Sequence, residues 1–232
     1  MPISILDAIR RGRILLADGA MGTQLQLEGL TPGSCGEIWN VEHPEKVMAI
    51  QSRYRDAGSD MVLTNTFQGT SLALSRHGAG HRVVELNRAA AENARRVMGP
   101  DRWVLGDLGP FGGMLAPLGE AEPEDVYAAF LEQARALLEG GVDAIIVETQ
   151  TALEELELGV RAAREAGAGV VIASMAFDHA VSGPARTMMG VTPAQAVQEL
   201  APLGVSAIGA NCGRGPEEME QVMAQMVAVR PE

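Results

Sequence analysis

The sequence predicts an α/β fold with a parallel sheet covered by helices, and three observations support this fold class. Short runs of Val, Ile and Leu recur along the 232-residue chain, and a stretch with helical periodicity follows each run. Continuous apolar runs are typical of parallel strands that are buried on both faces. Glycines stand just before the runs at 61–63, 144–147, 170–173 and 205–210, where they would end the preceding helices.

Six apolar runs are the expected strands, because each is too short to form a helix. No linker, low-complexity tract or block of charge divides them, so residues 1–232 are expected to form one domain. The expected strands are residues 14–17, 61–63, 103–105, 144–147, 170–173 and 205–210.

Four of the intervening helices are marked by a proline at the expected first helical position, where a missing N–H costs nothing. These prolines are Pro44, Pro123, Pro193 and Pro216. Before the third of them, Thr192 and Gln195 have the spacing of a capping box. Alternating strands and helices of this kind predict consecutive βαβ units.

Two architectures are compatible with such units, a doubly wound sheet and a (β/α)8 TIM-type barrel. A doubly wound nucleotide-binding fold would carry a GxGxxG fingerprint after its first strand, and residues 18–23, DGAMGT, do not match it. A barrel needs eight strands and about 250 residues. We therefore predict a barrel of which about six βα units are present and the last strands are lacking.

Composition excludes several classes of function. The chain has 18 Lys and Arg against 30 Asp and Glu, a formal charge of -12, which argues against nucleic acid or an anionic membrane as a partner. Two cysteines cannot build a disulfide framework and are typical of a reducing compartment, so a cytoplasmic location is expected. No signal peptide or membrane-spanning run is recognisable.

Polar residues follow the expected strands, at the carboxyl edge where parallel α/β folds bind ligands. They are Asp18, Thr64, Asn65, Thr66, Asp107, Glu148, Thr149, Ser174, Asn211 and Cys212. A carboxylate at the end of a buried strand needs a partner, so Glu148 suggests a bound ammonium, with Arg186 or Lys46 as the internal alternative. Asp18 or Asp107 taken singly could cap a helix, and Cys212 could be a small buried apolar residue.

Six segments of the chain together resemble the homocysteine S-methyltransferase family. They occur in the family's order over nearly the whole chain: residues 18–23 (DGAMGT), 40–44 (NVEHP), 64–67 (TNTF), 106–110 (GDLGP), 147–149 (VET) and 209–213 (GANCG). The DGAMGT form is most similar to the homocysteine-binding domain of cobalamin-dependent methionine synthases.

The resemblance implies a zinc-dependent transfer of a methyl group to the homocysteine thiolate, which forms methionine. In the family one zinc ion is held by three cysteine thiolates and by the substrate sulfur, and Cys212 matches the first of these ligands. Asp18 and Glu148 match the carboxylates that hold the amino group of homocysteine. The other matching rim positions, near the amino acid or the metal, are Gly19, Asn65, Thr66, Asp107, Ser174 and Asn211.

The resemblance also implies partners and has one departure. The donor is expected to be methylcobalamin, on a corrinoid or folate-binding module in another domain or chain. The other two zinc ligands are an adjacent Cys-Cys pair in the family, and this sequence contains none; the family gives Cys35 no such role. The alternatives are a non-catalytic or truncated homocysteine-binding module of a corrinoid system, and a relative that methylates another acceptor.

Overall fold

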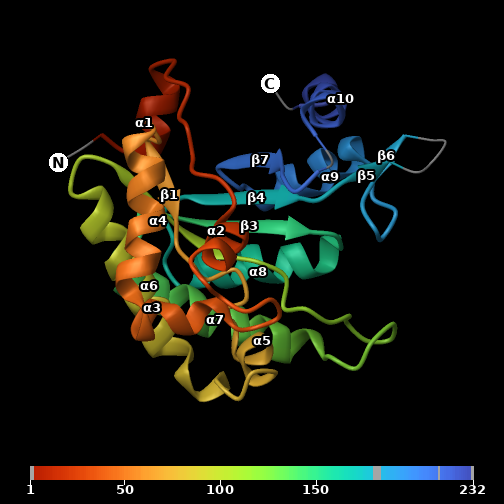
Figure 1. Ribbon diagram of the computed structural model, residues 1–232. Coiled ribbons are helices and arrows are strands. Elements are labelled where there is room, and N and C mark those ends of the chain that lie inside the picture. Colours follow the sequence, from red (N-terminus) through yellow and green to blue (C-terminus); the bar gives the residue numbers. More distant parts are fainter. Residues whose placement is uncertain (1–2, 180–183, 214, 231–232) are drawn as a thin grey trace.

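The structure is a computed structural model that describes residues 3–179, 184–213 and 215–230. Its centre is a five-stranded parallel sheet in the order β1-β2-β3-β4-β7 (Figure 1). The strands are β1 (Met61–Leu63), β2 (Trp103–Leu108), β3 (Ala144–Gln150), β4 (Val171–Met175) and β7 (Ala207–Ala210). A separate antiparallel pair, β5 (Asp178–His179) and β6 (Ala185–Arg186), lies beyond the carboxyl end of β4.

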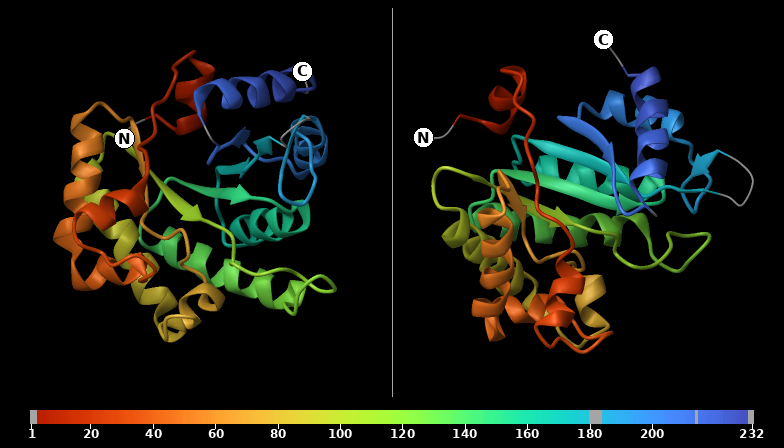
Figure 2. Two further views of the ribbon diagram at one scale, coloured as in Figure 1. Left: turned by 45° about the vertical axis from the view of Figure 1, so that its right-hand side comes forward. Right: turned by 45° about the horizontal axis from the view of Figure 1, so that its top comes forward.

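The strand order distinguishes the two predicted architectures. Successive strands of the main sheet are neighbours throughout, whereas a doubly wound sheet reverses its order at a switch point. The helices between the strands also contact one another in chain order, and the sheet curves within this outer layer (Figure 2). The arrangement is an arc of a (β/α)8 barrel, as the sequence predicts.

The helices are regular and follow the predicted signals. Pro44, Pro123, Pro193 and Pro216 each begin a helix, and Thr192 and Gln195 form the predicted capping box. The α-helices and short 3-10 helices are α1 (Ile5–Arg10), α2 (Met21–Leu27), η1 (Gly36–Ile38), α3 (Trp39–Glu42), α4 (Pro44–Asp56), α5 (Ser71–Ser75), η2 (Gly80–Arg82), α6 (Val83–Met98), α7 (Pro123–Glu139), α8 (Leu153–Glu165), α9 (Pro193–Leu200), η3 (Ala201–Leu203) and α10 (Pro216–Ala228).

One expected strand, residues 14–17, is not a strand. The segment lies beside the start of β1, where the backbone N–H groups of Asp60 and Met61 donate to the Leu16 carbonyl. Its other side has no strand partner among the described residues, and Ile14 is 96% exposed. Pairing on one side at a single residue is too little to form a ladder.

Of the five hydrophobic clusters among the described residues, the two largest lie on opposite faces of the sheet. The larger of the two lies between the sheet and helices α7, α8 and α9, and includes Phe130, Leu137 and Val147. The smaller of the two lies inside the arc, where Ile5 and Ala8 of α1 pack with Trp103. Helix α1 therefore closes the inside of the arc at the amino ends of the strands.

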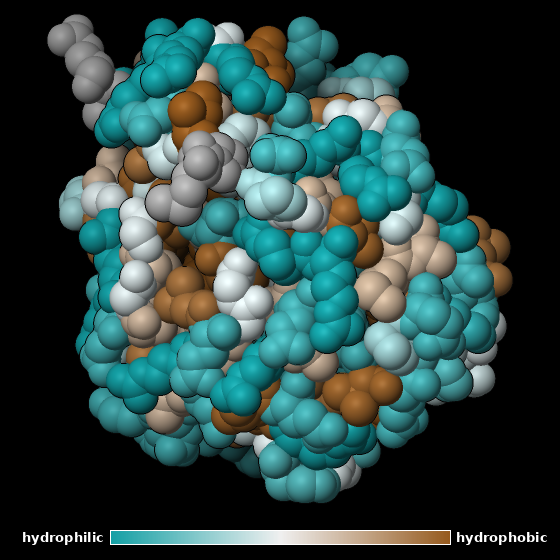
Figure 3. All heavy atoms as spheres, turned by 90° about the vertical axis from the view of Figure 1, so that its left-hand side faces the viewer, coloured by the Kyte–Doolittle hydropathy of each residue, from teal (hydrophilic) through white to brown (hydrophobic). Residues whose placement is uncertain are grey.

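The surface at the amino ends of the strands is mainly hydrophilic, with apolar side chains showing between the polar ones (Figure 3). Among the described residues, no helix combines the length and the apolar character that crossing a bilayer requires.

Candidate active site

The carboxyl edge of the sheet brings most of the predicted residues together. Asp18 lies beside the end of β1, Asp107 is in β2, Glu148 in β3 and Ser174 in β4. Asn211 and Cys212 follow β7 directly. Parallel strands deliver these side chains to one end because all of them run in the same direction.

Three carboxyl groups form an electrostatic cluster at this edge. Burial raises the pKa of Asp18 to about 7, and it also raises the pKa of Glu148. Asp107 is buried, and the pKa of its carboxyl is well above the usual range, first through burial and then through the charges of Glu148 and Asp18. A cationic ligand would relieve the repulsion between these carboxylates.

Within this cluster the oxygens differ in how they are bonded. The backbone N–H of Leu63 donates to both oxygens of Asp18, at 3.1 Å each. Asp107 Oδ1 is buried and has no hydrogen-bond partner in the described structure. An unpaired buried oxygen is costly, so Asp107 Oδ1 is an acceptor available to a bound donor.

Glu148 does not form an ion pair with Lys46 or Arg186, the two internal partners considered from the sequence. Lys46 Nζ donates to the Glu28 carbonyl, and Arg186 Nη1 donates to the Gly190 carbonyl. The side-chain contact of Glu148 comes instead from Asn211 Nδ2, at 3.2 Å from Oε2. An amide is neutral, so the negative charge of Glu148 is left available for a ligand.

Asn211 is the centre of a hydrogen-bond network that joins β3, β4 and β7. Its Oδ1 accepts from Ser174 Oγ at 2.7 Å and from the backbone N–H of Thr149 at 3.0 Å. Its Nδ2 lies 2.6 Å from Thr149 Oγ1 and 3.3 Å from Cys212 Sγ. Asn211 thereby links Glu148 to the thiol of Cys212.

Two residues of this network have a left-handed backbone. Thr149 has φ 57° and Cys212 has φ 53°, and they are the only non-glycine residues with positive φ in the described part of the chain. Left-handed φ is unusual for most residues and a clear outlier for a β-branched one such as threonine. Strain of this kind persists where the surroundings enforce it, often at functional sites.

Three predicted positions have mainly structural contacts. Asn65 Nδ2 donates to the Gly36 carbonyl and to Asn40 Oδ1, and Thr66 Oγ1 donates to the Asp107 carbonyl. Gly19 lies against the ring of Tyr54, where a Cβ would be only 3.1 Å from it. These contacts hold the segments that carry Asp18 and Asp107.

Sequence reasoning missed two buried carboxylates near the edge. Glu37 Oε1 accepts from the backbone N–H of Gln68, and its charge contributes to the raised pKa of Asp107. Glu155, in the first turn of α8, accepts from the backbone N–H of Phe111 at 2.8 Å, and burial raises its pKa to about 7. Neither stands at a strand end, so no spacing rule could have found them.

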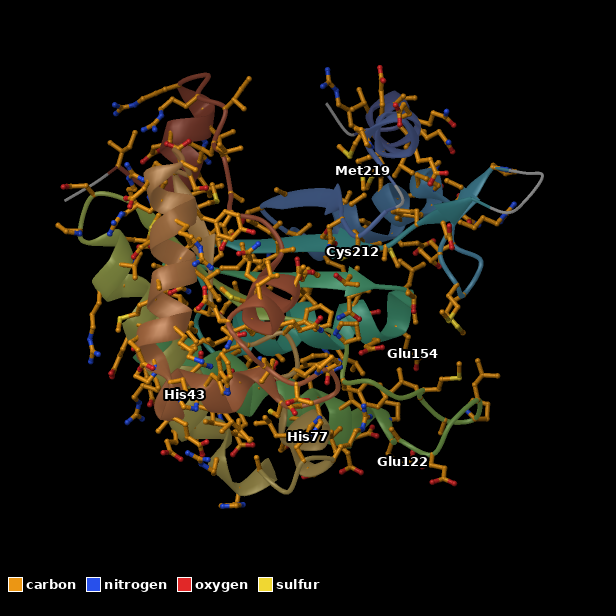
Figure 4. The ribbon with its side chains drawn as sticks, in the orientation of Figure 1. His43, His77, Glu122, Glu154, Cys212 and Met219 are labelled. Atoms are coloured by element: carbon orange, nitrogen blue, oxygen red, sulfur yellow. The ribbon has the colours of Figure 1, made fainter. Side chains whose placement is uncertain are left out.

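The described residues do not form a zinc site by themselves. Among them no three His, Cys, Asp or Glu side chains gather closely enough to hold a metal ion. Cys212 is exposed, and Cys35 is buried with its Sγ 3.2 Å from Glu37 Oε2. Figure 4 shows His43 and His77 on the helical side of the molecule, away from Cys212.

Comparison with known proteins identifies the class. The family described as "Homocysteine S-methyltransferase" matches residues 15–232, which include the whole barrel arc and its carboxyl edge. The chain belongs to the homocysteine S-methyltransferase family.

The curated relatives are much longer than this chain. A protein named methionine synthase from Mycobacterium tuberculosis is 36% identical over 230 residues, covering 94% of this chain and 19% of the relative. One of the same name from Mycobacterium leprae is 37% identical over 226 residues, covering 90% of this chain and 18% of the relative. The chain thus spans about a fifth of the length of these relatives.

Solved structures confirm the fold. The homocysteine methyltransferase MmuM from Escherichia coli, in its metallated form, superposes with a TM-score of 0.78 at 22% identity, covering 97% of this chain and 83% of that one. Its oxidized form gives a TM-score of 0.77 at 24% identity, covering 97% and 82%.

Proposed function

We propose that this chain binds homocysteine for the transfer of a methyl group to its sulfur, which forms methionine. The observation that carries the proposal is the pairing of a carboxylate cluster with a thiol through one amide, Asn211. Homocysteine has the matching groups, an ammonium at one end and a thiol at the other. Family membership supports the same substrate.

In this proposal Asp18 and Glu148 hold the substrate ammonium. Asp107 supports them with its unpaired Oδ1, and Asn65, Thr66 and Gly19 fix the segments around the site. Ser174 orients Asn211, and Asn211 orients Cys212. Holding both ends of the substrate aligns its sulfur for attack on a methyl group, which is catalysis by positioning.

The proposal includes zinc, with Cys212 as one ligand. Zinc would supply a deprotonated sulfur nucleophile at neutral pH. A single thiolate does not hold zinc, and Cys212 would supply one of the three thiolates that the family's site requires. We further propose that the methyl donor is methylcobalamin on a separate corrinoid module, because residues 18–23 (DGAMGT) resemble the homocysteine-binding domain of cobalamin-dependent enzymes.

Replacement of Glu148 tests the ammonium site. Glu148→Gln keeps the shape of the side chain and removes its charge, so we expect homocysteine to bind at least tenfold more weakly, on the scale of about 1.5–3 kcal/mol for a charged hydrogen bond. Binding of 4-mercaptobutanoate, the same thiol without its amino group, should change little. Calorimetric titration of both ligands measures the difference, and equal losses would remove Glu148 from the ammonium site.

The single thiol also supports a second candidate, a non-catalytic homocysteine-binding module of a corrinoid system. The two candidates differ in how binding responds to metal. If homocysteine binds with the same affinity in the presence of a chelator and of added zinc, the binding module is favoured. If zinc strengthens the binding, the methyltransferase is favoured.

A further inference from the structure

Thr149 lies between the two parts of the candidate site, the carboxylate of Glu148 and the thiol of Cys212. Its hydroxyl accepts from Asn211 Nδ2 at 2.6 Å and donates to Cys212 Sγ at 3.3 Å. Its backbone N–H donates to Asn211 Oδ1 at 3.0 Å. Thr149 therefore contacts both Asn211 and Cys212, and it directly follows Glu148 in β3.

The backbone around Thr149 is arranged for this contact. The β3–β4 ladder is regular up to Val147 and shifts its register before Gln150, so the irregularity includes Glu148 and Thr149. Thr149 and Cys212 both have left-handed φ, and each is the hydrogen-bond partner of the other. Two strained residues that meet across the sheet are an expected sign of a functional constraint rather than of packing.

We propose that Thr149 is a positioning residue that fixes the spacing between Glu148 and Cys212 and so sets the length of the amino thiol that the site accepts. This inference rests on the proposed function, in which Glu148 holds the ammonium and the substrate sulfur lies at Cys212. The amide of Asn211 reaches Glu148, Thr149 and Cys212 with only two hydrogens. The Thr149 hydroxyl supplies the additional hydrogen bond that holds the sulfur in place.

The proposal predicts a change in selectivity. Homocysteine and cysteine carry the same groups and differ by one methylene, so only a site of fixed length distinguishes them strongly. Thr149→Val keeps the branched shape and removes the hydroxyl, whereas Thr149→Ser keeps the hydroxyl. We expect the affinity ratio of L-homocysteine to L-cysteine to fall about tenfold in Thr149→Val and to stay within about twofold of wild type in Thr149→Ser.

The experiment is calorimetric titration of wild type and both variants with L-homocysteine and L-cysteine, together with thermal unfolding of each protein. A purely structural role would lower the melting temperature of Thr149→Val and weaken both ligands equally, which would overturn the proposal. An unchanged ratio in Thr149→Val would overturn it as well. If the wild type failed to bind homocysteine, the proposed function itself would be overturned. If the wild type bound homocysteine and Thr149→Val left the affinity ratio unchanged, only the inference about Thr149 would be overturned.

Discussion

At the scale of single residues, the candidate site brings three carboxyl groups together, where ionising all of them is unfavourable. Asp18, Asp107 and Glu148 are drawn from three different segments and share one end of the sheet, and burial raises the pKa of all three. Separated in the unfolded chain, they would ionise at their ordinary values. The folded protein holds them together at a cost that a bound ammonium would offset.

Homocysteine binding should therefore depend on pH. Below the pKa of about 7, Asp18 is protonated in the free protein and attracts an ammonium less strongly. Because the charged form binds better, affinity should rise about tenfold between about pH 6 and about pH 8, with release of a proton on binding at the lower pH. Calorimetry across this range checks the rise, and Asp18→Asn should flatten it. A pH-independent affinity in wild type would contradict the proposed role of Asp18.

Sequence predicted the positions of these residues better than their contacts. Asp18, Asp107, Glu148, Ser174, Asn211 and Cys212 do gather at one edge, because the rule for parallel strands depends only on chain direction. The partner of Glu148 was not predictable, since it depends on which side chain of a distant strand lies next to it. Thr149 was expected at this edge but was given no role of its own, because that role depends on a backbone angle that sequence does not reveal for threonine.

At the scale of elements, a buried carboxylate joins the loop after β2 to helix α8. Glu155 of α8 accepts from the Phe111 N–H, while Arg76 Nη2 donates to the Phe111 carbonyl at 3.1 Å. Phe111 is thus held on both sides of its backbone, in the loop that follows Asp107. This connection orients the loop after β2 relative to the helix after β3.

The raised pKa of Glu155 should appear in protein stability. Its pKa is about 4.5 in the unfolded chain and about 7 in the folded protein, so the folded state binds more protons between these values. The contribution of Glu155 to stability is therefore fully present below about pH 4.5 and is lost as the pH rises towards about 7, by on the order of 3 kcal/mol. Glu155→Gln, whose amide oxygen can still accept from Phe111, should make the decline in stability smaller by about this amount and leave the part due to Asp18 and the other buried carboxyl groups.

Denaturant unfolding at several pH values measures the effect, with Glu154→Gln as a matched control. Glu154 is adjacent in α8 and exposed, so its replacement should leave the pH dependence of stability unchanged. If Glu155→Gln showed the same decline as wild type, the buried carboxylate would not be its source.

Elements with strong local signals were predicted well. Four proline starts and one capping box begin helices as expected, because those signals act within a few residues. Five of the six predicted strands form. The segment 14–17 has the same apolar character, yet a strand also needs neighbours, and Leu16 meets only the start of β1.

At the scale of the whole molecule, the sheet has two open edges. On one side the outer edge of β7 has no strand partner among the described residues, and on the other the segment 14–17 is largely exposed. Beside β7, an apolar groove of about 330 Å³ lies against α10 and is lined in part by Val205, Ile208 and Met226. We propose that residues 1–232 form one barrel domain, in which β7 and the segment 14–17 border the opening of the arc.

The isolated chain should consequently associate through the β7 edge. Unpaired strand edges with apolar surroundings are templates for pairing with a second chain. We expect the average mass in sedimentation experiments to rise with protein concentration. Ala207→Lys, which places a charge on the exposed edge, should reduce this association.

Ala224→Lys is the control, because it adds the same charge at an exposed position of α10. Equal behaviour of the two variants would show that net charge, rather than the strand edge, governs association.

The two cysteines differ so much in accessibility that the unmodified sequence can be labelled with a dye at a single site. Cys35 is buried and its pKa is raised to about 12, which leaves it unreactive at neutral pH, whereas Cys212 is exposed at the carboxyl edge of the sheet. A maleimide dye would therefore attach at one sulfur, beside Asn211 and Thr149. No engineered cysteine is needed, and ligands that compete for Cys212 would be ranked by how much they slow the labelling.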